Sequence, residues 1–325
     1  MSARLAAGCA FALGAMLVAP AAGAAEAYPA RPVRMIVPFA AGGPTDVAAR
    51  VVAQHLGEQW GRPVVIDNRP GAGGVLGADI AAKATPDGYT LLLGSNSTFA
   101  VNAAVFRKLP FDVTRDFRVI GLVAIAPHLL VIRSGVPATS VAELVALAKK
   151  QPGKFTFASS GTGAIIHMAG ELFKSSAGVD IVHVPFKGGA PATVAMLAGE
   201  VDMMVNDLSQ FLAHIKAGRM RALAAASPKR IAALPDVPTF AELGMPKVES
   251  SNWFGLAAQA KAPPEIVKAL SDSLGRVLTL PEYRDRLATM NMEPLVLAPD
   301  QATAYARREL EKWTEVAKTV NIKLD

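Results

Sequence analysis

The chain contains very little cysteine, few aromatic side chains and little charge. One of its 325 residues is Cys, 6% are aromatic and 18% are charged, while 51% are hydrophobic. A single thiol excludes a disulfide-stabilised scaffold, and so apolar a composition excludes a disordered chain. At about 100 to 200 residues per domain, the length predicts one large or two medium domains, and we favour two.

Long apolar runs and basic runs are also missing after the first 25 residues. No later apolar stretch approaches the ~20 residues of a membrane-spanning helix, so we expect a soluble mature protein. Lys and Arg are spread along the chain rather than gathered beside aromatic residues, which argues against nucleic acid as a partner. The formal net charge of +6 mildly favours acidic small molecules as ligands.

Residues 1–25 have the pattern of a secretory signal peptide. Arg4 precedes an uncharged apolar stretch, and Ala22-Gly23-Ala24 offers a cleavage site between small residues. An uncleaved anchor and lipid attachment at Cys9 are the alternatives. The Ala- and Gly-rich centre favours cleavage, and Cys9 comes too early in the apolar stretch for lipid attachment. Cleavage removes the only Cys and one positive charge.

Apolar runs of strand length alternate with helical patterns, which is typical of a parallel α/β architecture. We expect strands at residues 33–39, 63–67, 89–93, 129–133, 155–159, 181–185, 201–205, 221–226 and 253–259. We expect helices at residues 46–60, 73–84, 141–150, 165–175, 191–198, 265–279 and 299–320, the last two being amphipathic helices that close the chain.

The crossing between the two halves is expected to be made by strands, because residues 117–127 contain no polar linker. The sequence therefore predicts an α/β fold of two hinged lobes, each a mainly parallel sheet flanked by helices. We place the first lobe at residues 26–126 and 251–325 and the second lobe at residues 127–250, so that the C-terminal helices complete the first lobe.

A buried strand, a Gly-rich loop and a helix start follow one another three times. The three are the first Gly loop (residues 39–43), the Ser/Gly loop (residues 159–164) and the Lys/Gly loop (residues 187–190). Glycine lets the backbone turn and approach a ligand, and the free N–H groups of the first helical turn favour an anion. Such loops lie at the carboxyl ends of strands, where ligands bind, so we expect them to line a cleft between the lobes. A plain strand-to-helix turn is the alternative for any single loop.

Neutral polar side chains follow two further strands and offer more donors and acceptors. They are Ser95, Ser97, Thr98 and Asn102 in the first lobe, and Asn206 in the second, where the acidic Asp207 accompanies it. Asp46 lies in the first turn of its helix, where the helix dipole favours a carboxylate with or without a ligand. An Asp46 side chain that faced the cleft would repel a ligand carboxylate and attract an ammonium group.

Other chemistry finds little support in the sequence. Residues 71–77 are similar to a dinucleotide fingerprint, but the third Gly comes one residue late, and no phosphate-binding loop of the Gly-x-x-x-x-Gly-Lys type is present. The five histidines form no metal-binding pair, so we expect neither a metal nor another cofactor. Ser159 and Ser160 lack the nucleophile elbow of the α/β-hydrolases. A secreted hydrolase using Ser160 and His167 stays as an alternative, although a packing role for His167 is favoured.

Several segments in order along nearly the whole mature chain resemble the substrate-binding proteins of tripartite tricarboxylate transporters, called the Bug family. Besides the three loops, the matching stretches include Asn68-Arg69-Pro70-Gly71-Ala72-Gly73-Gly74, Pro86-Asp87-Gly88-Tyr89 and His214-Ile215-Lys216-Ala217-Gly218. The resemblance implies a type II periplasmic binding protein. Such a protein is not an enzyme: it closes on a small organic carboxylate and presents it to a membrane permease. A periplasmic sensor subunit would share this fold and ligand chemistry.

The resemblance also implies which residues contact the ligand. By position these are Phe39, Ala40, Ala41, Gly42, Gly43, Asp46, Ser159, Ser160, Gly161, Thr162, Gly163, Ala164, His167, Gly188, Gly189 and Ala190, and we include Lys187 of the same loop. Two positions depart from the family pattern, because Ala164 stands where Ser is frequent and Ala195 where Asp is frequent. The missing hydroxyl at position 164 leaves the identity of the acid open. We expect the protein to act as a monomer.

Overall fold

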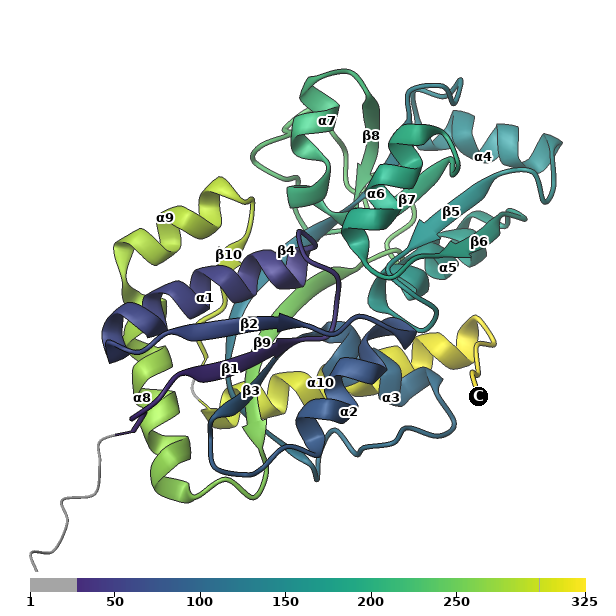
Figure 1. Cartoon of the computed structure of the whole chain (residues 1–325). Coiled ribbons are helices and arrows are strands. Elements are labelled where there is room, and N and C mark those ends of the chain that lie inside the picture. Colours follow the sequence, from purple (N-terminus) through teal and green to yellow (C-terminus); the bar gives the residue numbers. More distant parts are fainter. Residues whose placement is uncertain (1–27, 298) are drawn as a thin grey trace, which may run out of the picture.

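The computed structural model describes residues 28–297 and 299–325, which form two lobes. One ten-stranded sheet runs through both lobes in the order β2-β1-β3-β9-β4-β7-β5-β6, with β8 and β10 paired to β4. Figure 1 shows β5 to β8 with α4 to α7 in one lobe, β4 running through both lobes, and the remaining elements in the other lobe. The predicted signal peptide at residues 1–25 lies outside the described residues.

The first lobe is built on three parallel strands and one antiparallel neighbour. β1 (Val33–Val37) pairs in parallel with β2 (Val64–Asn68) and β3 (Thr90–Ser95), and β9 (Ser251–Gln259) runs antiparallel to β3. Alternate residues of β1 enter different cores: Met35 joins the cluster under α1 and α8, and Ile36 joins the cluster under α2 and α3. Both faces of these strands are therefore covered, which explains their unbroken apolar sequence.

The chain passes between the lobes along β4 and again where Ser250, bonded to Ala226 of the second lobe, leads into β9. β4 (Phe117–Arg133) pairs with β9 as far as Pro127 opposite Ser251, and then with β7 from His128 opposite Asp207 onward. A single strand thus belongs to the sheets of both lobes, which confirms the predicted crossing by strands. The residue boundaries that we assigned to the lobes stay a prediction.

The second lobe repeats the parallel arrangement. β5 (Thr156–Ser159) pairs in parallel with β6 (Val182–Pro185) and β7 (Met203–Asp207), while β8 (Met220–Ala225) is antiparallel to β4. Its helices are α4 (Val141–Lys150), α5 (Ile165–Ala177), α6 (Gly189–Ala198) and α7 (Leu212–Lys216). Ser140 caps α4, because its hydroxyl accepts a hydrogen bond from the Glu143 N–H.

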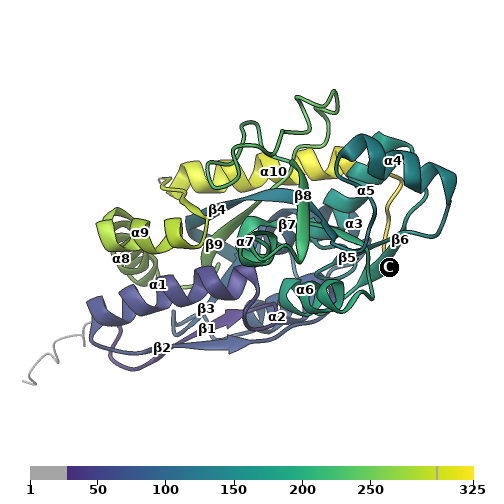
Figure 2. The same cartoon turned by 90° about the horizontal axis from the view of Figure 1, so that it is seen from above.

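The first lobe carries the remaining helices. They are α1 (Pro44–Trp60), α2 (Val75–Ala82), α3 (Asn102–Val105), α8 (Pro264–Thr279), α9 (Pro281–Thr289) and α10 (Pro299–Thr319), with β10 (Glu293–Pro294) between the last two. Figure 2 shows α10 extending from the first lobe toward α5 of the second. Both helices that we expected at the end of the chain are present as α8 and α10, but the sequence analysis did not predict α9 between them. Leu280 is extended because it precedes Pro281, so a separate helix α9 begins there.

The structure also adds local detail that the sequence did not predict. The helix that we expected at residues 73–84 begins at Val75, after a short 3-10 turn at Ala72–Gly74. Residues Ser97–Val101, for which the sequence analysis predicted no regular structure, form a π-helical turn that continues into α3. This turn sets Ser97 at the edge of the gap between the lobes, as the site below shows.

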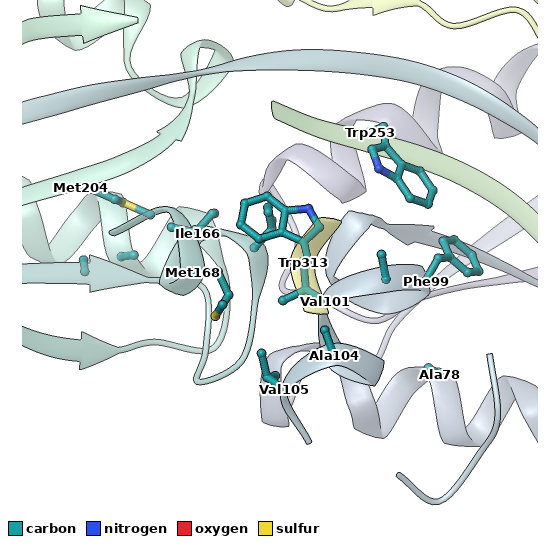
Figure 3. Close-up of a cluster of buried hydrophobic side chains, with 14 of the residues drawn as sticks. Ala78, Phe99, Val101, Ala104, Val105, Ile166, Met168, Met204, Trp253 and Trp313 are labelled. Atoms are coloured by element: carbon teal, nitrogen blue, oxygen red, sulfur yellow. The ribbon is translucent and has the colours of Figure 1, made fainter. Parts of the chain in front are cut away.

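One hydrophobic core spans both lobes. It includes Ile166 and Met168 of α5 together with Trp253 of β9 and Trp313 of α10. Figure 3 shows Trp313 between the α5 side chains and Trp253. Both indole N–H groups donate to the same carboxylate oxygen of Glu309, at 3.3 and 3.2 Å. The C-terminal helix is therefore fixed against the crossing strand and packs on the second lobe.

Candidate functional site

Three helices begin at the gap between the lobes. α1 starts after Gly43, α5 after Ala164 and α6 after Gly188, and none of these three preceding residues provides a side-chain cap. The first N–H groups of an α-helix have no acceptor within the helix, and the helix dipole is positive at this end. The three Gly loops thus each deliver an uncapped helix N-terminus to the same region.

A small cavity lies where these helix ends meet. It measures about 10 Å³, which is room for roughly one water molecule. Its lining comes from both lobes and consists of Phe39, Gly43, Pro44, Thr45, Ser95, Ser97, Ser160, Ile165, Ile166, Gly189 and Asn252. Each of these residues is uncharged. The electrostatic character of the cavity therefore comes from peptide dipoles, hydroxyl groups and one amide.

The lobes touch each other around this cavity. The Ser97 hydroxyl accepts a hydrogen bond of 2.8 Å from the Ile165 N–H at the start of α5, and the Gln210 side chain donates to the Gly42 carbonyl at 3.3 Å. A methyl group added at Gly73 would stand 2.7 Å from the Thr162 carbonyl oxygen. Contacts this close show that the two lobes are in a closed arrangement.

Several loop amides that we predicted to face a ligand have partners within the chain. Their N–H groups shape the loops: Gly42 donates to Asp46, Gly43 to Ala40, Gly161 to Ser159, Gly163 to His167 and Ala164 to Gly161. Donors at the cavity must therefore come mainly from the first turns of the helices and from hydroxyl groups. The prediction that the loop residues contact a ligand stays a prediction.

Asp46 points into the first Gly loop. Its carboxylate accepts hydrogen bonds from the Gly42 N–H at 2.9 Å, from the Asn68 amide at 3.0 Å and from the Arg50 guanidinium at 2.8 and 3.0 Å. Burial alone would raise the pKa of Asp46, but these hydrogen bonds and the Arg50 charge hold it below its ordinary value. The charge of Asp46 is thus neutralised by Arg50, and its structural effect is to fix the loop.

The Ser/Gly loop is held by two histidines. The Ser159 hydroxyl lies 2.6 Å from His183 Nε2, and His167 Nδ1 accepts a hydrogen bond of 3.2 Å from the Gly163 N–H. His167 Nε2 faces Glu171 at 3.8 Å. Both ring nitrogens of His167 are therefore directed at groups other than Ser160, which weakens the hydrolase alternative of Ser160 with His167.

A buried polar cluster joins the crossing strands behind the cavity. Asn252 of β9 donates to Asp207 of β7 at 3.2 Å, and His128 of β4 lies 2.7 Å from the Ser250 hydroxyl and 3.5 Å from Asp207. Burial lowers the pKa of His128 to about 3 and raises the pKa of Asp207 to about 8, so both groups are neutral near pH 7. Asp207 therefore adds no negative charge to the site at this pH.

The remaining predicted residues take supporting positions. Asn102 donates to the Gly73 carbonyl at 3.3 Å, and the Thr98 hydroxyl accepts from the Ser95 N–H at 3.4 Å. Asn206 is buried close to Gly189, while Lys187 is exposed. Gly188 and Ala40 face each other across the lobes, since a methyl group at Gly188 would stand 3.1 Å from the Ala40 Cβ.

Sequence reasoning missed Thr45, Ile165, Ile166, Asn252 and His183. The first three lie in the first turns of α1 and α5, so the predicted positions of these helix starts were a signal that could have identified them. Asn252 and His183 reach the site only through strand pairing: Asn252 lies opposite Ala126, and His183 lies opposite Phe157. The register of paired strands cannot be read from one sequence, so no local signal marked these two residues.

Two properties of the described residues bear on other kinds of function. In residues 28–297 and 299–325, every helix is too short or too polar to cross a bilayer. Within the same ranges, His, Cys, Asp and Glu side chains do not gather in threes in a way that could hold a metal ion.

Two lobes joined by crossing strands, with helix N-termini converging between them, define a type II periplasmic binding protein fold. The chain belongs to the tripartite tricarboxylate transporter family of receptors, which it matches over residues 48–322. It is 38% identical to protein BugT of Bordetella pertussis over 301 residues, covering 92% of each chain.

Solved structures agree with this assignment. An R. palustris protein solved with adipate is 35% identical, with a TM-score of 0.88, over 92% of this chain and 100% of that one. MatC from Rhodopseudomonas palustris, solved with bound malate, is 32% identical, with a TM-score of 0.85, over 89% of this chain and 99% of that one. Both neighbours thus hold dicarboxylates in the fold that this chain adopts.

Proposed function

We propose that this chain is a periplasmic solute-binding protein that captures a small organic carboxylate between its lobes and delivers it to a membrane permease. The observation that carries the proposal is the convergence of three uncapped helix N-termini on one uncharged cavity. Adipate and malate in two structural neighbours and the receptor family support the same ligand class and the same kind of partner.

Physical chemistry explains why such a cavity suits an anion. Each helix N-terminus stabilises a negative group by ~0.3 to 1 kcal/mol when exposed, and by more when it is partly buried. Hydroxyl groups such as those of Thr45, Ser95 and Ser160 add donors at the same place. Because the cavity holds about one water molecule, a carboxylate must enter while the lobes are further apart.

Lobe closure then transmits binding to the partner. A carboxylate that contacts both lobes stabilises the closed arrangement by its differential affinity, which shifts the population toward closure. The permease would recognise the closed arrangement. Since donors at the cavity are uncharged, no ionised side chain has to lose its partner when the ligand arrives or leaves.

A thermal-shift panel tests the proposal. We expect adipate, malate or another small carboxylate to raise the melting temperature, because a ligand at about 100 times its dissociation constant adds about 2.7 kcal/mol to the free energy of unfolding. The bound compound should be recovered chemically unchanged, and a permease should be retained by the liganded protein. A panel in which only neutral amides raise the melting temperature would refute the anion site.

A further inference from the structure

The Ser/Gly loop, residues 159–164, forms one wall of the cavity through Ser160 and leads into α5. Its shape depends on where its own N–H and hydroxyl groups find partners. Two of these partners are imidazole nitrogens, from His167 on α5 and His183 on β6. Neither nitrogen belongs to a residue that lines the cavity.

The two imidazoles are stacked on each other. Their ring centroids are 3.8 Å apart with an angle of 22° between the planes, and Phe157 of β5 stacks on His183 at 5.0 Å. His167 is buried and His183 is half-buried. Three neighbouring elements, β5, β6 and α5, therefore fix the position of the pair beneath the loop.

Hydrogen bonding determines which nitrogens carry protons. His167 Nδ1 accepts from the Gly163 N–H, so its proton must lie on Nε2, which faces Glu171. The Ser159 hydroxyl accepts from the Gly161 N–H and has two acceptors within reach, the Gly161 carbonyl at 3.2 Å and His183 Nε2 at 2.6 Å, and the much shorter distance assigns its proton to His183 Nε2. His183 is then protonated on Nδ1. Each histidine accepts one hydrogen bond from the loop.

We infer that His167 and His183, both in the neutral form, are positioning residues that hold the Ser/Gly loop in the shape required for ligand binding. The inference rests on the proposed function, because it concerns the same cavity. It assigns the pair a contribution to affinity that does not involve contact with the ligand. A protonated His167 would leave the Gly163 N–H without its acceptor, and a protonated His183 would reverse its bond to Ser159 and turn the hydroxyl proton toward the Gly161 carbonyl.

The surroundings favour the neutral form of both rings. Burial lowers the pKa of His167 to about 3 and of His183 to about 4, and the charge of Lys174 acts in the same direction on both. The other titratable group facing His167 is Glu171, and burial raises the pKa of its carboxyl. These shifts agree with the acceptor roles that the geometry assigns.

Paired substitutions separate the acceptor from the ring. His167→Phe keeps an aromatic ring in the stack but removes the acceptor of Gly163, whereas His167→Asn places an amide oxygen near the former Nδ1. His183→Phe and His183→Gln make the same comparison for the Nε2 of His183. His55→Phe is the matched control, because His55 is also buried on a helix and its Nδ1–H donates to the Val51 carbonyl within that helix, away from the cavity.

Calorimetric titration with adipate and malate measures the outcome. We expect His167→Phe and His183→Phe to weaken binding about tenfold, the cost of leaving a buried donor without its acceptor. His167→Asn and His183→Gln should recover affinity to within about threefold of the unsubstituted chain, and His55→Phe should not change it. Wild-type affinity in both Phe variants, or equal losses in the Phe and amide variants, would overturn the inference.

Two further measurements keep this test independent of folding and of the proposed function. Should His167→Phe fail to fold, His183→Phe at a half-buried position carries the comparison. Histidine ¹⁵N spectra of the ligand-free chain report the protons directly, and the inference requires Nε2–H on His167 and Nδ1–H on His183. The opposite tautomers would refute it even if ligands bind, while absence of any carboxylate binding would refute the proposed function alone.

Discussion

The contact between Gly73 and the Ser/Gly loop offers a direct test of lobe closure. Gly73 has φ 62° and ψ 21°, and a methyl group at this position would stand 2.7 Å from the Thr162 carbonyl oxygen and 3.3 Å from the Ala164 nitrogen. Both atoms belong to the backbone of the opposite lobe and cannot rotate away. Gly73→Ala should therefore prevent the lobes from closing fully.

Gly61 provides a control with the same backbone conformation. It has φ 60° and ψ 23° at the end of α1, and a methyl group there meets nothing within 4 Å. Alanine in the left-handed conformation costs ~1 to 2 kcal/mol at either position. Any difference in binding between Gly73→Ala and Gly61→Ala therefore comes from the contact between the lobes.

The expected loss can be estimated from overpacking. Forcing a methyl group into a closed contact costs ~1 to 3 kcal/mol, which corresponds to about 5- to 150-fold weaker binding. Calorimetric titration with adipate and malate measures this loss, and small-angle scattering should show that Gly73→Ala contracts less than Gly61→Ala when ligand is added. If the two variants bind within twofold of each other, the closed contact is not part of ligand binding.

Three other predictions concern bonds around the cavity. Ser97→Ala removes the acceptor of the Ile165 N–H and should lower stability by ~1 kcal/mol and weaken carboxylate binding; unchanged melting and affinity would contradict this. Asp207→Asn should raise the melting temperature more at pH 8 than at pH 5. The pKa of Asp207 is raised to about 8 in the folded chain, so the free energy of unfolding falls as the pH rises from the pKa of the unfolded chain toward 8, and the Asn variant avoids this loss. An equal gain at both pH values would argue against a neutral carboxyl. Asp46→Asn should destabilise the chain at pH 7 and have less effect near pH 3. The lowered pKa of Asp46 in the folded chain contributes stability that is lost when the carboxylate is protonated on acidification. A loss of stability that does not depend on pH would show that the ion pair with Arg50 does not provide this contribution.

The sequence predicted the parts of this fold that depend on local pattern. The strand, Gly loop and helix start recur three times, and the structure brings all three helix starts to one cavity. Apolar runs such as 33–37 identify strands that are covered on both faces. Helix α9 was missed because its sequence is mostly polar, with only Tyr283 and Leu287 buried.

The parts that were not predicted depend on contacts between distant segments. His183 reaches His167 because β6 pairs with β5 in one particular register, and Asn252 reaches Asp207 because β9 and β7 both pair with β4. The orientation of Asp46 was also left open, since a carboxylate in the first turn of a helix is favourable whether it faces a ligand or the loop. Its hydrogen bonds to Gly42 and Arg50 decide the question.

The start of α5 shows how closure and ligand binding are energetically linked. Ala164 precedes this helix without a hydroxyl of its own, and the Ile165 N–H is satisfied by Ser97 of the other lobe. When the lobes separate, this N–H must turn to water, so closure by itself satisfies one of the free N–H groups of the helix end and leaves the others to the ligand. On the proposed mechanism, the ligand then has to supply only part of the free energy of closure. Affinity for the carboxylate therefore depends on contacts between the lobes as well as on contacts with the ligand.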